Sequence, residues 1–212
     1  MTRFAILLGG SLHVTDRLRR QVAGARVLAA DSGIRHAHAL DIEPELWLGD
    51  FDSTSPALAR RYAHVPQITF PREKDMTDGE LALRKAFELG ATEVILCGAF
   101  GGERTDHTML HLTVATAEAQ AGRRVWLTGG KEEAYPVIPG RYVFDLPERT
   151  LFSLIGFDAL DGLDIEGAEW PLKKAKVAFG SSLTLSNSVK DELRISLEFG
   201  NAILIATLFE IA

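Results

Sequence analysis

The chain lacks several features that would assign it to a specialised class of protein. Cys97 is its single cysteine among 212 residues, so an intramolecular disulfide is excluded and a reducing compartment is expected. The surrounding EVILCGAF indicates a small buried side chain and not a reactive thiol. No apolar run approaches the roughly 20 residues of a membrane span, and the N-terminal run is too short for a signal peptide. We therefore expect a cytoplasmic protein.

The chain also lacks a block of positive charge. Its formal charge is −6 and its pI is about 5.5, which argues against broad electrostatic attachment to nucleic acid or to an anionic membrane. Neither LLGGSLHVTD nor GAFGGERTDH fits a Walker A motif or a dinucleotide fingerprint, which disfavours a P-loop kinase and an NAD-dependent enzyme. The apolar content of 46% is that of an ordinary globular protein of one domain or two small ones.

Short apolar runs alternate with amphipathic stretches up to residue 130. This alternation predicts an N-terminal α/β domain with a doubly wound, mostly parallel sheet and helices on both faces. Helices are expected in TDGELALRKAFELG, which ends at Gly90, and in TDHTMLHLTVATAEAQAG. The expected strands are FAILLGG, ARVLAAD, ELWLGD, QITF, EVILCGAF and RRVWLTGG.

From residue 131 onward, glycine, proline and aspartate separate short β-type runs. This pattern predicts a C-terminal antiparallel β-sandwich. The segment TGGKEEAYPVIPG is expected to be the junction, so the predicted domains are 1–130 and 131–212. The expected strands are RYVFDL, TLFSLI, AKVAFG, LTLSNSV, LRISLEF and AILIATLF.

Acidic residues follow the predicted strands of the first domain. Ligands bind beyond the carboxyl ends of strands in an open parallel sheet, so these carboxylates are expected to converge on one edge. Two carboxylates as close as Asp50 and Asp52 raise each other's pKa unless a cation or hydrogen-bond donors compensate them. Hard oxygen ligands suit Mg²⁺ and not zinc, and no histidine or cysteine pairs occur at metal spacing. The set is Asp31, Asp50, Asp52, Asp75, Asp78 and Asp106.

Each acid also has a structural alternative. Asp78 can be a helix N-terminal acid beside a threonine cap, and Asp31 and Asp106 can be caps. Asp52 can form a turn with the serine that follows it. Clustering favours a functional site, because capping requires no gathering of acids at one edge.

Cations and glycines accompany the acids. Lys74 and Arg104 lie close to them in the sequence, and Gly101 and Gly102 allow a backbone to approach a ligand closely. A glycine-rich turn between a strand and a helix is also common for steric reasons alone. His107 is a candidate base or phosphate ligand, or a polar cap partner. Together with the acids, these residues predict a site for a polyphosphate and a metal ion.

Six segments appear in the order found in thiamin pyrophosphokinases, and the chain resembles that family over nearly its whole length. The resemblance implies an ATP- and Mg²⁺-binding catalytic domain over 1–130 and a thiamin-binding and dimerisation domain over 131–212. It also implies a homodimer with active sites at the subunit interface, which transfers pyrophosphate from ATP to the thiamin hydroxyl and releases AMP. The segments are ADSG, PELWLGDFDS, FPREKDMTDGELAL, GAFGGERTDHTMLHL, GAEWPL and FGSSLTLSNSV.

The resemblance implies roles for single residues. Ser186 and Asn187 match the Ser-Asn pair that binds thiamin, whereas the sequence alone would make LTLSNSVKDEL a hairpin turn. Arg104 matches an arginine that contacts phosphate. The expected catalytic acids are Asp50, Asp52, Asp75 and Asp78, of which Asp50, Asp52 and Asp78 match the Mg²⁺ site. The expected phosphate-binding set is Asp31, Lys74, Gly101, Gly102, Arg104, Asp106 and His107.

The chain departs from the family pattern in three places. Glu103 is an additional residue before the arginine, His111 stands where asparagine is common, and Val189 stands where some members carry an aromatic residue. Trp170 is a candidate substitute for that aromatic, although a tryptophan between β-runs is usually core.

Two other functions fit the same sequence. One is a related diphosphokinase that acts on another hydroxymethyl heterocycle, such as a pterin alcohol. The other is a non-catalytic protein that binds a nucleotide or thiamin. The Ser-Asn segment favours thiamin, and the large acidic set favours a transfer site.

Overall fold

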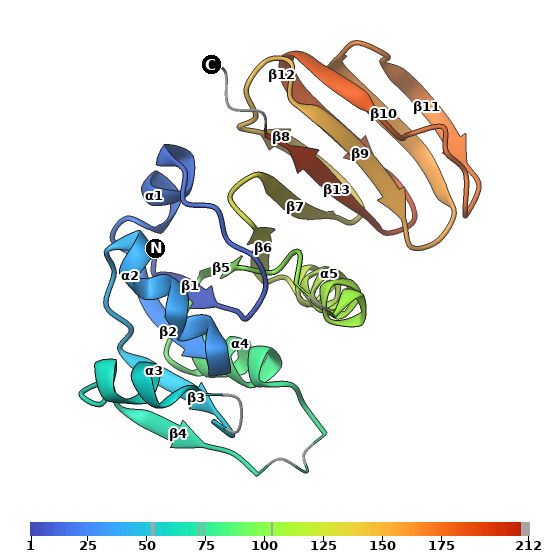
Figure 1. Cartoon of the computed structure of the whole chain (residues 1–212). Helices are drawn as coiled ribbons and strands as arrows, with labels where there is room; N and C mark the ends of the chain where they lie inside the picture. The colour runs from blue at the N-terminus through green and yellow to red at the C-terminus, as the bar shows by residue number, and fades with distance from the viewer. Residues whose placement is uncertain (52–53, 72, 74, 103, 209–212) are drawn as a thin grey trace. The chain divides into compact units, whose positions relative to one another are not determined.

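The computed structural model describes residues 1–51, 54–71, 73, 75–102 and 104–208, which divide into two units (Figure 1). The first unit contains residues 1–111 and 123–130. The second contains residues 112–122 and the chain from 131 onward. The sequence analysis placed all of 112–122 in the first domain, whereas this division groups that segment with the second.

The first unit alternates strands with helices along the chain. In order, its elements are β1 (Arg3–Leu7), α1 (Asp16–Val22), β2 (Arg26–Ala30), the 3-10 helix η1 (Asp31–His36), α2 (Ala37–Leu40), β3 (Leu46–Gly49), α3 (Pro56–Arg61), β4 (Gln67–Thr69), α4 (Asp78–Glu88), β5 (Glu93–Cys97), α5 (Thr105–Gln120), which runs on into the second unit, and β6 (Arg124–Thr128).

The sheet of the first unit has the strand order β6-β5-β1-β2-β3-β4, and all of these pairs are parallel. The chain moves outward from β1 to β4, then returns to the other side of β1 for β5 and β6. The order therefore reverses between β1 and β5, and this is the switch point of a doubly wound sheet. The predicted fold of the first domain is confirmed.

Both faces of this sheet are covered. Successive strand side chains point to opposite faces, so a strand buried on both sides reads as a continuous apolar run. One face packs against α1, η1, α2 and the region of α3 through residues such as Leu18, Ile34 and Tyr62. Helix α4 contacts β1, β2 and β3 through its apolar stripe of Ala82, Leu83 and Ala86.

The second unit is the predicted antiparallel sandwich. Strand β12 belongs to both of its sheets, because its first residues pair with β9 and its later residues pair with β10 and β8. One sheet continues from β9 through β13 to β7, and the other from β10 to β11. The strands are β7 (Glu132–Val137), β8 (Gly140–Phe144), β9 (Leu151–Gly156), β10 (Leu160–Ala168), β11 (Leu172–Val177), β12 (Asn187–Leu197) and β13 (Ala202–Thr207).

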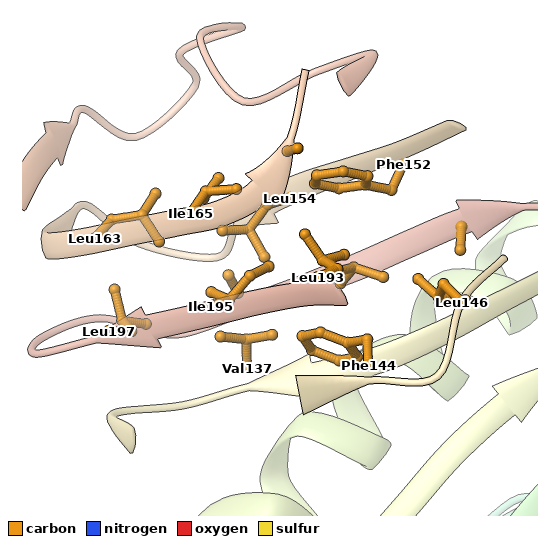
Figure 2. Close-up of a cluster of buried hydrophobic side chains, with 14 of the residues drawn as sticks. Val137, Phe144, Leu146, Phe152, Leu154, Leu163, Ile165, Leu193, Ile195 and Leu197 are labelled. Carbon is orange, nitrogen blue, oxygen red and sulfur yellow. The ribbon is translucent and has the colours of Figure 1, made fainter. Parts of the chain in front are cut away.

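Apolar side chains from both sheets form the core of the sandwich (Figure 2). Leu193, Ile195 and Leu197 lie on alternate positions of β12, so one face of that strand supplies the middle of the cluster. Phe152 and Leu154 of β9 join them from the other sheet. The sequence predicted these segments as β-type runs, and the structure adds that their apolar side chains form a core.

Two strands of the second unit lie where none was expected. Residues 132–137, assigned to a junction, form β7 and pair with β13. Pro136 makes residues 132–137 atypical of a strand, because proline cannot donate to a ladder. Gly162 and Gly167 are typical of a turn, but both lie within β10. They have positive φ, 65° and 72°, and the pairing register of this strand shifts at bulges.

Cys97 is fully buried at the end of β5, as predicted, and burial raises the pKa of its thiol to about 12. The thiol therefore stays protonated and is a packing group. Among the helices of the described residues, none combines the length and the apolar character needed to cross a bilayer.

Leu193 provides a test of the sandwich core. Leu193→Ala is expected to lower the free energy of unfolding by about 2–5 kcal/mol, because it leaves a cavity among fully packed side chains. Val143→Ala on β8 is the control, since Val143 is exposed and its truncation is expected to cost under about 0.5 kcal/mol. Urea unfolding of both variants measures the difference, and equal losses would contradict this core.

Candidate active site

Backbone hydrogen bonds join the loops that follow β1 and β5, on the two sides of the switch point. The N–H of Leu8 donates to Cys97 O at 2.7 Å, and that of Gly10 to Gly98 O at 2.9 Å. The N–H of Ser11 donates to Phe100 O at 2.7 Å. Backbone atoms therefore fix the loops at the carboxyl ends of β1 and β5 to each other.

Glycine is required where these loops touch. A Cβ on Gly10 would lie 2.4 Å from Gly98 O and 2.6 Å from Phe100 O, and both atoms belong to the backbone. Gly98 has φ 76°, and a Cβ there would lie 2.7 Å from Leu8 O. The sequence LLGG and the first glycine of GAFGG thus serve the close approach of two loops.

Arg35 and His36 hold the loop after β1 from η1. The Arg35 guanidinium donates to Gly9 O and to Gly10 O, the latter at 2.9 Å, and to Ser32 Oγ at 3.1 Å. His36 Nε2 donates to Gly10 O at 2.9 Å. Burial lowers the pKa of His36, with the Gly10 bond acting in the opposite direction. A neutral ring can still donate this bond.

Asp31 and Asp50 follow neighbouring strands. Ala30 pairs with Leu48, and an added Cβ on Gly49 would lie 3.2 Å from Asp31 Cα. Both aspartates are partly buried. Gly49 therefore brings the ends of β2 and β3 close together, and the two carboxylates follow directly from adjacent strand ends, as the sequence predicted.

A strained turn follows Asp50. Phe51 has φ 60°, in the left-handed region that costs a non-glycine residue of order 1–3 kcal/mol. Its ring packs edge-on against Trp47 at a centroid distance of 4.9 Å, and Trp47 Nε1 donates to Asp31 O at 2.8 Å. Trp47 therefore links the Asp31 and Asp50 segments. Asp52 lies outside the described residues.

Asp78 is the first residue of α4 and follows the N-cap Thr77, as the structural alternative for this acid predicted. Thr77 accepts from Glu80 N at 3.3 Å, and Glu80 Oε2 accepts from Thr77 N at 2.9 Å, which makes a capping box. Asp78 is partly buried and Asp75, just before the helix, is exposed. Lys74 lies outside the described residues.

The turn after β5 is open to solvent. Gly101 and Gly102 have φ 64° and 93°, in a region that favours glycine. Arg104 holds Asp106 in a two-pronged ion pair, with Nη2 2.6 Å from Oδ2 and Nε 2.9 Å from Oδ1. Asp106 Oδ1 also accepts from the N–H of His107 at 3.0 Å.

This pairing affects the charges at the turn. The Arg104 hydrogen bond is the main cause that lowers the pKa of Asp106 to about 2. Both side chains are exposed, and Glu103 lies outside the described residues. Arg104, expected at a phosphate, is bonded to a carboxylate that was expected at the same site.

Within the described residues, no three His, Cys, Asp or Glu side chains gather closely enough to hold a metal ion. The expected set depends on Asp52, which those residues do not include. Of the expected Mg²⁺ ligands, the structure describes Asp50, directly after β3, and Asp78, at the start of α4, and carboxylate oxygens suit Mg²⁺. The Mg²⁺ site therefore stays a prediction.

Ser186 and Asn187 lie at the start of β12 in the second unit. Ser186 has φ 57° and is exposed, and its N–H donates to Ser153 Oγ at 3.0 Å. The buried Asn187 accepts at Oδ1 from the N–H groups of Trp170 at 3.1 Å and Ser188 at 2.8 Å. Its Nδ2 donates to Trp170 O at 2.8 Å. Asn187 thus holds the backbone of Trp170 from both sides.

Trp170 is 62% exposed, so the general expectation that such a tryptophan is core does not hold here. Asn187 fixes its backbone while its indole stays accessible. Val189 is buried in the sandwich core, so the absent aromatic at that position is replaced by a packing residue.

Sequence reasoning missed Arg35 and His36, and it gave no role to His111; these side chains bond to the loops after β1 and β5. Their spacing matches no metal or catalytic motif. One signal was available, because Arg35 and His36 lie just beyond the ADSG segment at a strand end. His111 Nδ1 bonds to Ala99 O at 3.2 Å, a contact that no local pattern announces.

Two family profiles match the chain. One, described as thiamin pyrophosphokinase, catalytic domain, matches residues 22–127. The other, described as thiamin pyrophosphokinase, vitamin B1 binding domain, matches residues 142–204. A curated relative, thiamine pyrophosphokinase of Bacillus subtilis strain 168, is 29% identical over 161 residues, 74% of this chain and 74% of the relative.

Solved structures share the fold over almost the whole chain. The crystal structure of thiamine pyrophosphokinase from Bacillus subtilis superposes with a TM-score of 0.87 at 24% identity, covering 99% of this chain and 100% of that one. Thiamin pyrophosphokinase from Candida albicans has a TM-score of 0.81 at 12% identity, covering 98% and 89%. At these identities the likeness establishes the fold alone.

Gly10 provides a test of the joined loops. Gly10→Ala is expected to destabilise the protein by about 1–3 kcal/mol, because its methyl group meets two backbone carbonyls that cannot rotate away. Gly9→Ala is the matched control, since a Cβ there meets only the rotatable Ser32 Oγ at 2.8 Å. Denaturant unfolding compares the two, and a larger loss for Gly9→Ala would contradict the geometry.

Proposed function

Because the chain belongs to the thiamin pyrophosphokinase family, we propose that it transfers pyrophosphate from ATP to the thiamin hydroxyl, giving thiamin diphosphate and AMP. The family membership makes it a pyrophosphotransferase. The particular donor, metal ion, residue roles and assembly described below are parts of the proposal.

One structural observation supports the catalytic site most directly. Asp31 and Asp50 follow adjacent strand ends, beside a switch point whose loops are fixed by backbone bonds. Such a crevice is where doubly wound sheets bind nucleotides. Carboxylates are poor partners for bare phosphates, so their presence there favours a nucleotide that arrives with a divalent cation.

In this proposal, Asp50, Asp52 and Asp78 hold Mg²⁺, and Asp31 and Asp106 support the site. The bound ion would neutralise charge on the phosphate oxygens. The chain itself positions the triphosphate. Gly101 and Gly102, at positive φ in the turn after β5, would offer their N–H groups to it, and Lys74, Arg104 and His107 would complete the phosphate-binding set.

The thiamin hydroxyl then attacks the β-phosphorus of ATP in line with the departing AMP. Positioning and charge stabilisation supply most of the rate of such transfers, so no covalent nucleophile is required. Arg104 exchanges its bond with Asp106 for a bond with phosphate. Asp75, exposed just before α4, orients the attacking hydroxyl and accepts its proton.

Thiamin binding is assigned to the second unit. The exposed Ser186 hydroxyl contacts the aminopyrimidine. Asn187 acts through Trp170, because both acceptor positions of its oxygen and one of its N–H groups are already used. The exposed indole of Trp170 offers a flat apolar face to the aromatic rings of thiamin, one of which is cationic.

The proposed assembly is a homodimer in the cytoplasm, with active sites at the subunit interface. Phe179, Leu183 and Leu185 are large apolar residues exposed in the segment that leads to Ser186. An apolar surface next to a binding residue is typical of a protein interface. The interface would thereby bring the Ser186 of one subunit to the acids of its neighbour.

Asp50 tests the transfer reaction. Purified protein is incubated with ATP, Mg²⁺ and either thiamin, a pterin alcohol or no acceptor, and AMP and the acceptor mass are measured. Thiamin-dependent AMP with a diphosphate mass shift is expected, and Asp50→Asn is expected to lower kcat at least about 100-fold, because metal and phosphate positioning are lost together. Glu88→Gln, at the other end of α4, is the control.

If AMP forms only with the pterin alcohol, the acceptor is the pterin and not thiamin. If no AMP forms with any acceptor, the chain is a binding protein that does not catalyse transfer. In the same assay, Asp75→Asn is expected to lower kcat and to remove the acid limb of the pH–rate profile. Full turnover with an unchanged profile would take Asp75 out of the hydroxyl-orienting role.

Trp170 tests the thiamin site. Trp170→Ala is expected to raise the KM for thiamin about tenfold and to leave the KM for ATP unchanged, because a stacking partner is lost. Asn187→Ala is expected to give the same pattern, since it releases the backbone of Trp170. Phe199→Ala, which truncates another exposed aromatic residue of the second unit, is the control. Equal shifts in both KM values would contradict the assignment.

A further inference from the structure

His111 lies on α5 and reaches back to the turn at which that helix begins. Its Nδ1 is 3.2 Å from Ala99 O. A carbonyl oxygen can only accept, so Nδ1 carries the proton. Burial lowers the pKa of His111, which favours the neutral ring with a lone pair on Nε2. The neutral ring therefore donates one hydrogen bond, from Nδ1 to the turn.

The other side of the ring faces the first turn of α4. A Cβ on Gly79 would lie 3.6 Å from His111 Nε2 and 3.1 Å from Leu8 Cδ2. Gly79 thus lets α4 approach both the end of β1 and the ring. Asp78, one of the proposed catalytic acids, is the residue directly before Gly79. His111 therefore lies between the glycine-rich turn and the helix end that carries this acid.

Other backbone bonds also hold the turn. Gly98 N and Ala99 N donate to Thr128 O at 2.9 and 3.5 Å, Gly98 O accepts from Gly10 N at 2.9 Å, and Phe100 O accepts from Ser11 N at 2.7 Å. None of these bonds is made by the carbonyl of Ala99. A peptide is planar, so a bond to Ala99 O also sets the direction of the Phe100 N–H and the start of the chain into Gly101. Ala99 is buried, so its carbonyl has little access to water as a replacement donor.

We propose that His111 is a positioning residue for the triphosphate. Its ring fixes the Ala99–Phe100 peptide and thereby orients the N–H groups of the glycine turn. It also sets the distance between this turn and the first turn of α4. This inference rests on the proposed function, because it takes the turn to bind phosphates. It adds a role for a residue that touches neither substrate nor metal ion.

The experiment compares His111→Asn with His111→Leu. The two side chains have the same branched skeleton, but asparagine can place an N–H where Nδ1 was and leucine cannot. The KM values for ATP and thiamin, the Kd of Mg²⁺-ATP by calorimetry, and amide hydrogen exchange over residues 98–102 are measured for both. His38→Leu, an exposed position on α2, is the control.

His111→Leu is expected to raise the KM and the Kd for ATP about tenfold, the value of one positioning hydrogen bond, with the KM for thiamin unchanged. Exchange over 98–102 is expected to become faster. His111→Asn is expected to stay within about threefold of the original protein in all readouts. If His111→Leu fails to fold, His111→Gln replaces it, because its longer side chain also removes the donor at the Nδ1 position.

Equal behaviour of the asparagine and leucine variants in ATP affinity and in exchange would overturn the positioning role. A general loss of packing would raise both KM values together and would also overturn it. If the original protein binds ATP but forms no AMP with thiamin, while the two variants still differ, the proposed function fails and the positioning role stands. If the original protein does not bind ATP, both fail.

Discussion

The close contact between the loops after β1 and β5 is the constraint on which the rest of the first unit depends. Three backbone hydrogen bonds join these loops, and Gly10 and Gly98 leave no room for a side chain between them. A doubly wound sheet always reverses its strand order somewhere, and here backbone bonds join the two loops at the reversal. The turn that carries Gly101 and Gly102 therefore begins from a fixed position.

Side chains also bond to the loops and turns that surround this contact. Arg35 and His36 bond to the loop after β1, and Trp47 ties the turn after β3 to Asp31. These groups donate to backbone carbonyls, so none of them needs a charged partner inside the site. The charged groups of the crevice thus remain at the edge of the sheet, where a ligand can reach them. In the second unit, Asn187 likewise donates to a backbone carbonyl, that of Trp170.

Much of the fold could be predicted, because buried parallel strands and alternating sandwich strands leave clear apolar patterns. The placement of Asp31 beside Asp50 followed from the same patterns, since neighbouring parallel strands end at one edge. The left-handed turn at Phe51 could not be predicted, because its cost is balanced by a contact with Trp47 that depends on tertiary structure. The paired bonds between Asn187 and Trp170 likewise join residues 17 positions apart, the first at the start of β12 and the second between β10 and β11.

The ion pair between Arg104 and Asp106 places a competitor beside the arginine that the proposed function assigns to phosphate. The carboxylate is tethered two residues from the guanidinium, so it is present at a high effective concentration and occupies the arginine without ordering a second molecule. If Arg104 binds phosphate as proposed, a small anion such as acetate or free phosphate would have to displace this carboxylate with a single point of attachment. A triphosphate that is anchored elsewhere along its length would make the same exchange within an already bound complex. In the proposed function, the pair would therefore favour long, multiply anchored anions over small ones.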